Sequence, residues 1–202
     1  MSAKIEVKSV YFDIRINDDS GSGARKDLFT WKPQLPSGWF YLGPAATNTA
    51  NKPSGIIVRE IVPGTLGSLV DWTQVWKDSG SGNSTDYALW RAVPEKSDHI
   101  AFGGFFTRNY NKPTIDDAKG IKTLPRDLVE KVAANPEVWT DAGSGASADG
   151  AVWGISTVGH VRAIGTGAFV PVRGYNAPPS DIYALNGNQI QISADSLQIE
   201  EA

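Results

Sequence analysis

One motif occurs three times in the sequence, and this internal repeat constrains the fold more than any other feature. In each copy an Asp is followed two residues later by Gly-Ser-Gly, eight residues later by a second Asp and twelve residues later by a Trp. The copies run from Asp19 to Trp31, from Asp78 to Trp90 and from Asp141 to Trp153, so their starts lie 59 and 63 residues apart. A fixed period of this length predicts a repeat architecture.

The similarity continues beyond the motif, because Asn51-Lys52-Pro53 recurs as Asn111-Lys112-Pro113 and, more weakly, as Asn176-Ala177-Pro178. We therefore expect three internal repeats at about 5–60, 61–122 and 123–199. A unit of about 60 residues buries little apolar surface by itself. The three repeats are accordingly expected to form one domain over residues 1–202.

Each repeat has the pattern of strands and turns. Asp27, Phe29 and Trp31 alternate on one face of an extended segment, and Gly21 and Gly23 can adopt the positive φ of a tight hairpin. With roughly four strands per repeat, the predicted fold is an all-β, pseudo-threefold β-prism with three sheets as its sides. A β-trefoil, whose units are usually shorter, is the alternative.

Two further expectations concern the ends of the chain and one segment between them. Alternating apolar residues over 10–16 and at Ile190 and Ile192 predict terminal strands whose pairing would close the ring and remove exposed edges. One short helix is predicted from Pro125 to Ala134, because it begins with Pro, has an acidic first turn and stops at Asn135-Pro136.

The aromatic residues divide into two groups. Trp31, Trp90 and Trp153 occur at the same place in every repeat, so we expect them to fill the axis of the prism. Aromatic residues that break the repeat are candidates for a contact surface, and several adjoin Gly, Pro or Asn. They are Trp39, Tyr41, Trp72, Tyr110 and Tyr175.

Composition excludes several classes of function. With 19 basic and 22 acidic residues, a net charge of −3 and no basic cluster longer than Arg25-Lys26, the chain does not resemble a nucleic-acid binder. It contains no Cys, which excludes disulfides, a thiol nucleophile and a Cys-ligated metal. Its two His, His99 and His160, fall in different repeats and leave little for acid–base or zinc chemistry. Three equivalent Asp pairs also differ from the single cleft of an enzyme. We therefore expect a protein that is not an enzyme.

The sequence also bears on location. No apolar run approaches the roughly 18 residues that a membrane span requires. The N-terminus lacks the pattern of a secretory signal. The expected location is therefore the cytoplasm, or the exterior after release without a signal peptide.

Three stretches together resemble a known family: Trp31-Lys-Pro-Gln-Leu-Pro-Ser-Gly-Trp-Phe-Tyr-Leu-Gly43, Val75-Trp-Lys-Asp-Ser-Gly-Ser-Gly82 and Leu89-Trp-Arg-Ala-Val-Pro94. They are similar to the vacuolar protein sorting-associated sixty-two family, whose members repeat tryptophan–proline and Asp-x-Gly-Ser-Gly elements. The resemblance covers roughly residues 27–185. It implies an all-β, prism-like domain that occurs alone or attached to larger proteins, and no established catalytic residues to carry over. The family's Pro-x-Gly-Tyr element stands here as Pro36-Ser-Gly-Trp39.

The repeated Asp-x-Gly-Ser-Gly loops are the main candidate site. One interpretation is structural: the first Asp caps an Asx-turn and the second supports it. A second is that the loops, gathered at one end of the prism, bind a glycan or a lipid headgroup. A third is a Ca²⁺ ion held by oxygen ligands at Asp19, Asp78 and Asp141. The predicted ligand-binding residues are Asp19, Ser22, Asp27, Asp78, Ser81, Asp86, Asp141, Ser144, Asp149, Trp39 and Tyr175.

The function expected from the sequence is that of a non-enzymatic binding module, either lectin-like or targeted to a membrane surface. The alternative is a protein-interaction or self-assembly module of a toxin or trafficking assembly. Its partners would then be another protein or further copies of the chain. No cofactor is expected other than the Ca²⁺ ion considered above.

Overall fold

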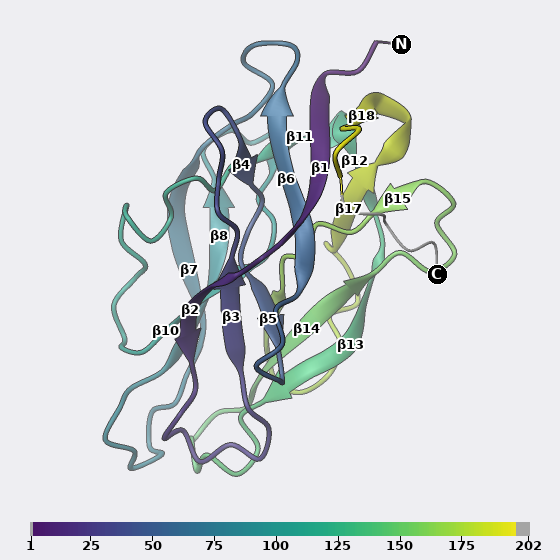
Figure 1. Cartoon of the computed structure of the whole chain (residues 1–202). Helices are drawn as coiled ribbons and strands as arrows, with labels where there is room; N and C mark the ends of the chain where they lie inside the picture. Colours follow the sequence, from purple (N-terminus) through teal and green to yellow (C-terminus); the bar gives the residue numbers. More distant parts are fainter. Residues whose placement is uncertain (1, 197–202) are drawn as a thin grey trace.

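The same succession of five strands occurs three times along the chain, one strand more per repeat than the roughly four expected, and the second unit runs to Pro125, past the predicted border at 122. The computed structural model describes residues 2–196, which have an all-β, prism-like fold (Figure 1). The strands of the first repeat are β2 (Ile14–Asp18), β3 (Phe29–Lys32), β4 (Phe40–Tyr41), β5 (Ala45–Thr47) and β6 (Ser54–Glu60). Those of the second are β7 (Leu69–Lys77), β8 (Ala88–Pro94), β9 (His99–Ile100), β10 (Gly104–Thr107) and β11 (Leu124–Pro125). Those of the third are β13 (Ala133–Thr140), β14 (Gly150–Ser156), β15 (Ala163–Ile164), β16 (Val170–Arg173) and β17 (Tyr183–Asn186).

Three equivalent antiparallel sheets carry the repeated motif. Their strand orders are β2-β3-β5, β7-β8-β10 and β13-β14-β16, and the motif is the hairpin between the first two strands of each. The other two strands of each repeat pair with one another, as β4–β6, β9–β11 and β15–β17. The same pairing in three successive segments is the pseudo-threefold arrangement that the repeat predicted.

The two ends of the described chain pair with each other. Strand β1 (Ile5–Tyr11) runs parallel to β18 (Ile190–Ile192), with Ile5 opposite Ile190 and Val7 opposite Ile192. It also pairs antiparallel with β6. The predicted closure by Ile190 and Ile192 is confirmed, although their partner is the start of β1 rather than residues 10–16.

The axis between the three sheets is filled by a cluster of buried apolar side chains. They are Leu28, Trp76, Tyr87, Leu89, Phe106, Trp139, Val152 and Phe169. The expectation that the motif tryptophans fill the axis is wrong. Trp31 and Trp90 are buried in a second cluster, and Trp153 is half-buried beside a third. Side chains alternate along a strand, so the residue directly after the second Asp points to the axis and the Trp points away.

The axial side chains complement one another across the borders between repeats. Trp76 of the second repeat occupies the space where Gly150 of the third has no side chain, since a Cβ there would lie 2.4 Å from the Trp76 Cγ. Trp139 packs edge-on against Trp76, with ring centroids 5.6 Å apart. The first repeat has Asn17 in place of these tryptophans, and its amide donates to the Phe106 carbonyl at 2.8 Å. Unequal side chains therefore fill one axis.

The predicted helix from Pro125 to Ala134 is not formed. The segment contains the end of β11, a single 3₁₀ turn η1 (Arg126–Leu128), strand β12 (Val129–Lys131) and the start of β13. Val129 pairs with Leu185, and Ala133 pairs with Ser156. Helix propensity is a weak local preference, and here long-range strand pairing overrides it. A second 3₁₀ turn, η2 (Gly187–Gln189), precedes β18.

The described residues do not include the C-terminal end of the chain. The last residues of the third predicted repeat, 197–199, lie outside the described residues. Within residues 2–196, no helix is long and apolar enough to cross a membrane.

Candidate functional site

The three glycine hairpins meet at one end of the prism, the lower end in Figure 1. Two of the three contacts between them are equivalent. The Arg25 N–H donates to the Ala142 carbonyl at 2.8 Å, and the Ser147 N–H donates to the Ser79 carbonyl at 2.9 Å. In both cases the sixth residue after one motif Asp bonds to the residue after another motif Asp. This pattern joins the first hairpin to the third and the third to the second.

The contact between the first and second hairpins uses side chains instead. The Asn83 amide donates to the Ser22 carbonyl at 2.7 Å, and the Tyr87 hydroxyl donates to the Ser20 carbonyl. Arg108 adds a charged contact, because its guanidinium donates to the Asp18 carboxylate at 2.8 Å. Each hairpin therefore touches the other two, and the three loops form one continuous surface.

The first Asp of each motif holds its own hairpin together. One carboxylate oxygen accepts the N–H of the residue nine positions on, at 2.8 Å from Leu28, 2.9 Å from Tyr87 and 2.8 Å from Gly150. The other accepts the hydroxyl of the Ser three positions on, in the pairs Asp19–Ser22, Asp78–Ser81 and Asp141–Ser144. The three carboxylates are buried. These six predicted residues therefore have a structural role in the hairpins, but the carboxylates bond to groups three and nine residues on, not to the N–H two residues on that defines an Asx-turn.

The second Asp of each motif has the opposite environment. Asp27, Asp86 and Asp149 are exposed on the hairpin surface. An exposed carboxylate can accept hydrogen bonds from a ligand without giving up bonds that support the fold. Among the predicted residues, these three are therefore the ones placed to contact a partner.

A tyrosine lies beside two of the three Asp pairs. The Tyr110 hydroxyl donates to the Asp78 carboxylate at 2.9 Å, and burial together with the charges of Asp78 and Asp86 raises its pKa far above the ordinary value. In the third repeat, burial and the charges of Asp141 and Asp149 raise the pKa of Tyr175 to about 12. Both tyrosines accordingly stay neutral near pH 7, and Tyr110, whose proton is donated to Asp78, can still accept a hydrogen bond at its oxygen.

The first repeat lacks this tyrosine. Ala50 precedes Asn51 where Tyr110 and Tyr175 precede the corresponding Asn of their repeats. The buried Asp19 instead accepts a hydrogen bond from the Trp139 indole at 3.0 Å. An exposed Asp next to a tyrosine therefore occurs in the second and third repeats only.

Other predicted contact residues lie elsewhere. Trp39 follows β3, which leads the chain away from the hairpins, and its half-buried ring lies under the Arg59 guanidinium, 4.9 Å from the ring centroid. Tyr41 and Trp72 are buried in the second apolar cluster, so their expected role at a contact surface is wrong. The structure brings Tyr175, but not Trp39, to the Asp motifs.

Sequence reasoning did not join Tyr110 to the Asp motif. A signal was present, because Tyr stands directly before the aligned Asn111 and Asn176. The role of Arg108 has no such signal. Its carboxylate partner Asp18 belongs to another repeat, 90 positions away in the sequence.

The hairpins do not gather carboxylates into a cluster. Within the part of the chain that the structure describes, no group of three or more His, Cys, Asp or Glu side chains could hold a metal ion. Asp19, Asp78 and Asp141, the residues considered for Ca²⁺, each direct their oxygens into their own hairpin. The Ca²⁺ hypothesis therefore has to rest on the exposed oxygens of these loops.

Comparison with known proteins supports the fold. No protein-family model matches the sequence, and a search of curated proteins finds no match. Among solved structures, the chain is similar to GNIP1Aa from Chromobacterium piscinae, with a TM-score of 0.81 and 26% sequence identity. The match covers 95% of this chain and 39% of the GNIP1Aa chain, so this chain spans about two fifths of the length of that neighbour.

Proposed function

We propose that this protein is a non-enzymatic, lectin-like binding module that recognises a glycan through the surface formed by its three glycine hairpins. The observation that carries the proposal is that the two Asp residues of each motif have different environments. The first Asp is buried and holds the hairpin, whereas Asp27, Asp86 and Asp149 are exposed on one surface. Exposed acceptors on a preformed loop suit a ligand rich in hydroxyl groups.

The tyrosines favour two of the three positions. At Asp86 and Asp149 a sugar would meet a carboxylate acceptor and a neutral tyrosine, Tyr110 or Tyr175. The tyrosine ring adds an apolar face against which a sugar ring can pack. The exposed carboxylates of Asp86 and Asp149, whose hairpins contain no Lys or Arg, also disfavour a phosphate, because like charges repel. A neutral glycan therefore suits the surface better than an anionic lipid headgroup.

Because the site is repeated, the protein is suited to surfaces that present many copies of the same ligand. Weak sites on one rigid body gain avidity where many copies of a ligand are presented together. The similarity to 39% of GNIP1Aa supports the idea that a domain of this kind can belong to a longer chain. In such a chain it would direct the remaining domains to a surface.

Glycan arrays test the proposal. We expect the wild-type protein to bind a set of neutral glycans, and Asp86→Asn combined with Asp149→Asn to lose most of the signal. Asp27→Asn is the matched control, since Asp27 is also exposed but has Ala50 instead of a tyrosine, and it should retain binding. Background signal from the wild-type protein at all printed densities would refute glycan recognition.

Anionic liposomes test the alternative of a lipid headgroup and targeting to a membrane surface. Liposome flotation without glycan binding would favour that alternative.

A second candidate function is a protein-interaction or self-assembly module of a toxin or trafficking assembly. It is favoured by Val158 and Val161, which are 80% and 99% exposed in one loop between β14 and β15, because neighbouring exposed apolar side chains can form the patch that an interaction site requires. Light scattering tests self-assembly, and a strict monomer at high concentration would count against it. Under this second proposal, the protein would be a member of the vacuolar protein sorting-associated sixty-two family. It would act in the cytoplasm, or outside the cell after release without a signal peptide.

A further inference from the structure

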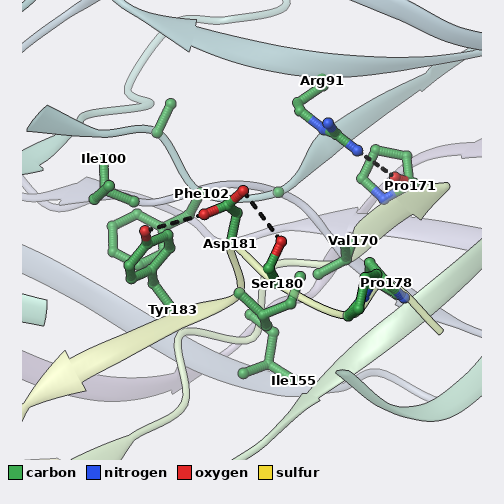
Figure 2. Close-up of a pocket in the computed structure, with 14 residues that line it drawn as sticks. Arg91, Ile100, Phe102, Ile155, Val170, Pro171, Pro178, Ser180, Asp181 and Tyr183 are labelled. Atoms are coloured by element: carbon green, nitrogen blue, oxygen red, sulfur yellow. Dashed lines mark hydrogen bonds between the residues drawn. The ribbon is translucent and has the colours of Figure 1, made fainter. Parts of the chain in front are cut away.

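A cavity of about 300 Å³ lies between the second and third repeats, away from the glycine hairpins (Figure 2). Its apolar lining includes the buried side chains of Ile100, Phe102 and Val170. Ile155 and Pro178 contribute further apolar surface. Pockets that bind small ligands combine such an apolar lining with a few polar groups that set the orientation.

The polar groups of this cavity are only weakly paired with one another. Ser180 donates to Asp181 at 3.4 Å, Tyr183 donates to Asp181 at 3.5 Å, and Arg91 donates to the Pro171 carbonyl at 3.3 Å. These distances lie at or beyond the long end of the normal range, and such bonds are weak. Arg91 and Asp181 are also exposed to solvent, so a ligand would replace water at most of their hydrogen-bonding positions. Figure 2 shows Asp181 between Ser180 and Tyr183, with Arg91 at another part of the lining.

Asp181 also has a strained backbone. It is the one non-glycine residue with positive φ, +62°, among residues 2–196. Such a conformation costs about 1–3 kcal/mol and occurs often at ligand sites, where it places a side chain. Because Asp tolerates this region better than most residues, the strain is consistent with a carboxylate held at a required position.

Comparison of the repeats shows that this cavity depends on an insertion. In the first repeat, Pro53 leads directly into β6 at Ser54. In the third repeat, residues 179–182 separate the equivalent Pro178 from β17, and this insertion lines the cavity. The strained Asp181 lies within it, so the feature is additional to the shared architecture.

We propose that this cavity binds a small zwitterion with an apolar body, of the size and chemistry of a free aromatic or branched α-amino acid. Arg91 pairs with the carboxylate of the ligand, Asp181 accepts its ammonium group, and the apolar lining covers its side chain. One positive and one negative residue match a ligand that carries both charges and no net charge. A volume of about 300 Å³ is at the lower end for ligand pockets and limits the ligand to this size. The site is separate from the hairpin surface and does not depend on glycan recognition there.

Titration with L-phenylalanine, followed by the amide resonances of the ¹⁵N-labelled protein, tests the proposal. We expect saturable shifts at Ile100, Phe102, Asp181 and Tyr183 with L-phenylalanine up to about 10 mM, a concentration that detects even weak ligands. Phenylacetate and phenethylamine each carry one of the two charges and should bind at least tenfold more weakly. Absence of shifts with L-phenylalanine, or equal affinity for phenylacetate, would overturn the proposal.

Variants of the protein separate the site from the fold. Asn adopts positive φ as readily as Asp, so Asp181→Asn should keep the wild-type spectrum and weaken L-phenylalanine binding at least tenfold. Asp181→Gly relieves the backbone strain and should show the same loss if Asp181→Asn does not fold. The control is Asp116→Asn at a second cavity of about 640 Å³ in the second repeat, which should leave affinity unchanged. Unaltered binding in both Asp181 variants, or shifts caused by D-glucose instead, would overturn the assignment.

Discussion

Replacing Val172 with Thr should stabilise the protein, because it would supply a hydrogen bond that one repeat lacks. In the first repeat the Trp31 indole N–H donates to the Thr47 hydroxyl at 2.8 Å. In the second repeat Trp90 donates to Thr107 at 2.9 Å. Each Thr hydroxyl in turn donates to the carbonyl two residues on, at 2.7 Å. The motif tryptophan is thus satisfied by a two-step chain of hydrogen bonds.

The third repeat has lost this chain. Strand pairing places Val172 opposite Ala151, just as Thr107 stands opposite Ala88. The Trp153 indole nitrogen is buried and has no hydrogen-bond partner among the described residues. A Thr at position 172 would stand where it can accept from Trp153 and donate to the carbonyl two residues on.

The expected gain in the free energy of unfolding follows from the cost of leaving the buried Trp153 indole N–H without a partner. A buried donor without a partner costs about 1–3 kcal/mol, whereas exchanging one buried methyl group for a hydroxyl loses roughly 0.8 kcal/mol of apolar burial. We therefore expect Val172→Thr to raise the free energy of unfolding by about 1 kcal/mol. For a chain of this length, that corresponds to about 2–4 °C in Tm.

Urea and thermal unfolding, followed by circular dichroism, measure the effect. The reciprocal variant, Thr107→Val, should lose about 1–3 kcal/mol because it leaves the Trp90 indole unpaired. Val172→Ala controls for the lost methyl groups and should destabilise the protein. The reasoning would be refuted if Val172→Thr lowered stability, or if Thr107→Val left it unchanged.

Three further predictions concern the hairpins and a buried histidine. Asp141→Ala should lower the free energy of unfolding by about 3 kcal/mol, since two hydrogen bonds to a buried carboxylate are lost, whereas Asp149→Ala should change it by less than about 0.5 kcal/mol; equal effects in urea unfolding would contradict the assigned roles. Burial, with the charge of Lys96, holds the pKa of His99 below its ordinary value, so the folded state favours neutral His99, and stability should fall as pH drops below about 6.5. Glutamine in place of the exposed His160 should leave this dependence intact, and a flat profile between pH 7 and 5 would contradict it. Because the first Asp of each hairpin is already bonded within its loop, Tm should be the same in millimolar Ca²⁺ and in excess EDTA, and a rise with Ca²⁺ would instead support a bound ion.

Much of the fold could be predicted from spacing alone. The recurrence of the motif from Asp19, Asp78 and Asp141 indicated three equivalent strand–hairpin units, and Ile190 and Ile192 indicated closure by the terminal strands. These features depend on local alternation and on glycine conformation, which a short stretch of sequence already contains. The prediction of a helix from Pro125 to Ala134 was wrong, because the conformation of that segment depends on long-range pairing with β14 and β17 and not on local sequence.

The candidate site could be located from the sequence, but its chemistry could not be divided among its residues. Asp19 and Asp27 look alike in sequence, and so do Asp78 and Asp86. The first of each pair is enclosed by its own hairpin and by distant groups, such as the Trp139 indole, 120 positions from Asp19. The second is exposed because nothing from another repeat covers it. The binding roles proposed for Asp86 and Asp149 therefore rest on their exposure, which only the tertiary structure shows.

The sequence by itself determined the repeat, the all-β class and the place where the loops would be found, since each follows from residue types at a fixed spacing. Only the tertiary structure decided which side chains fill the axis, as with Trp76 over Gly150. It also revealed the cavity beside Asp181 and the unpaired Trp153 indole. These features arise where one repeat packs against another or departs from its equivalents, and packing across such borders depends on the shapes of residues far apart in the chain.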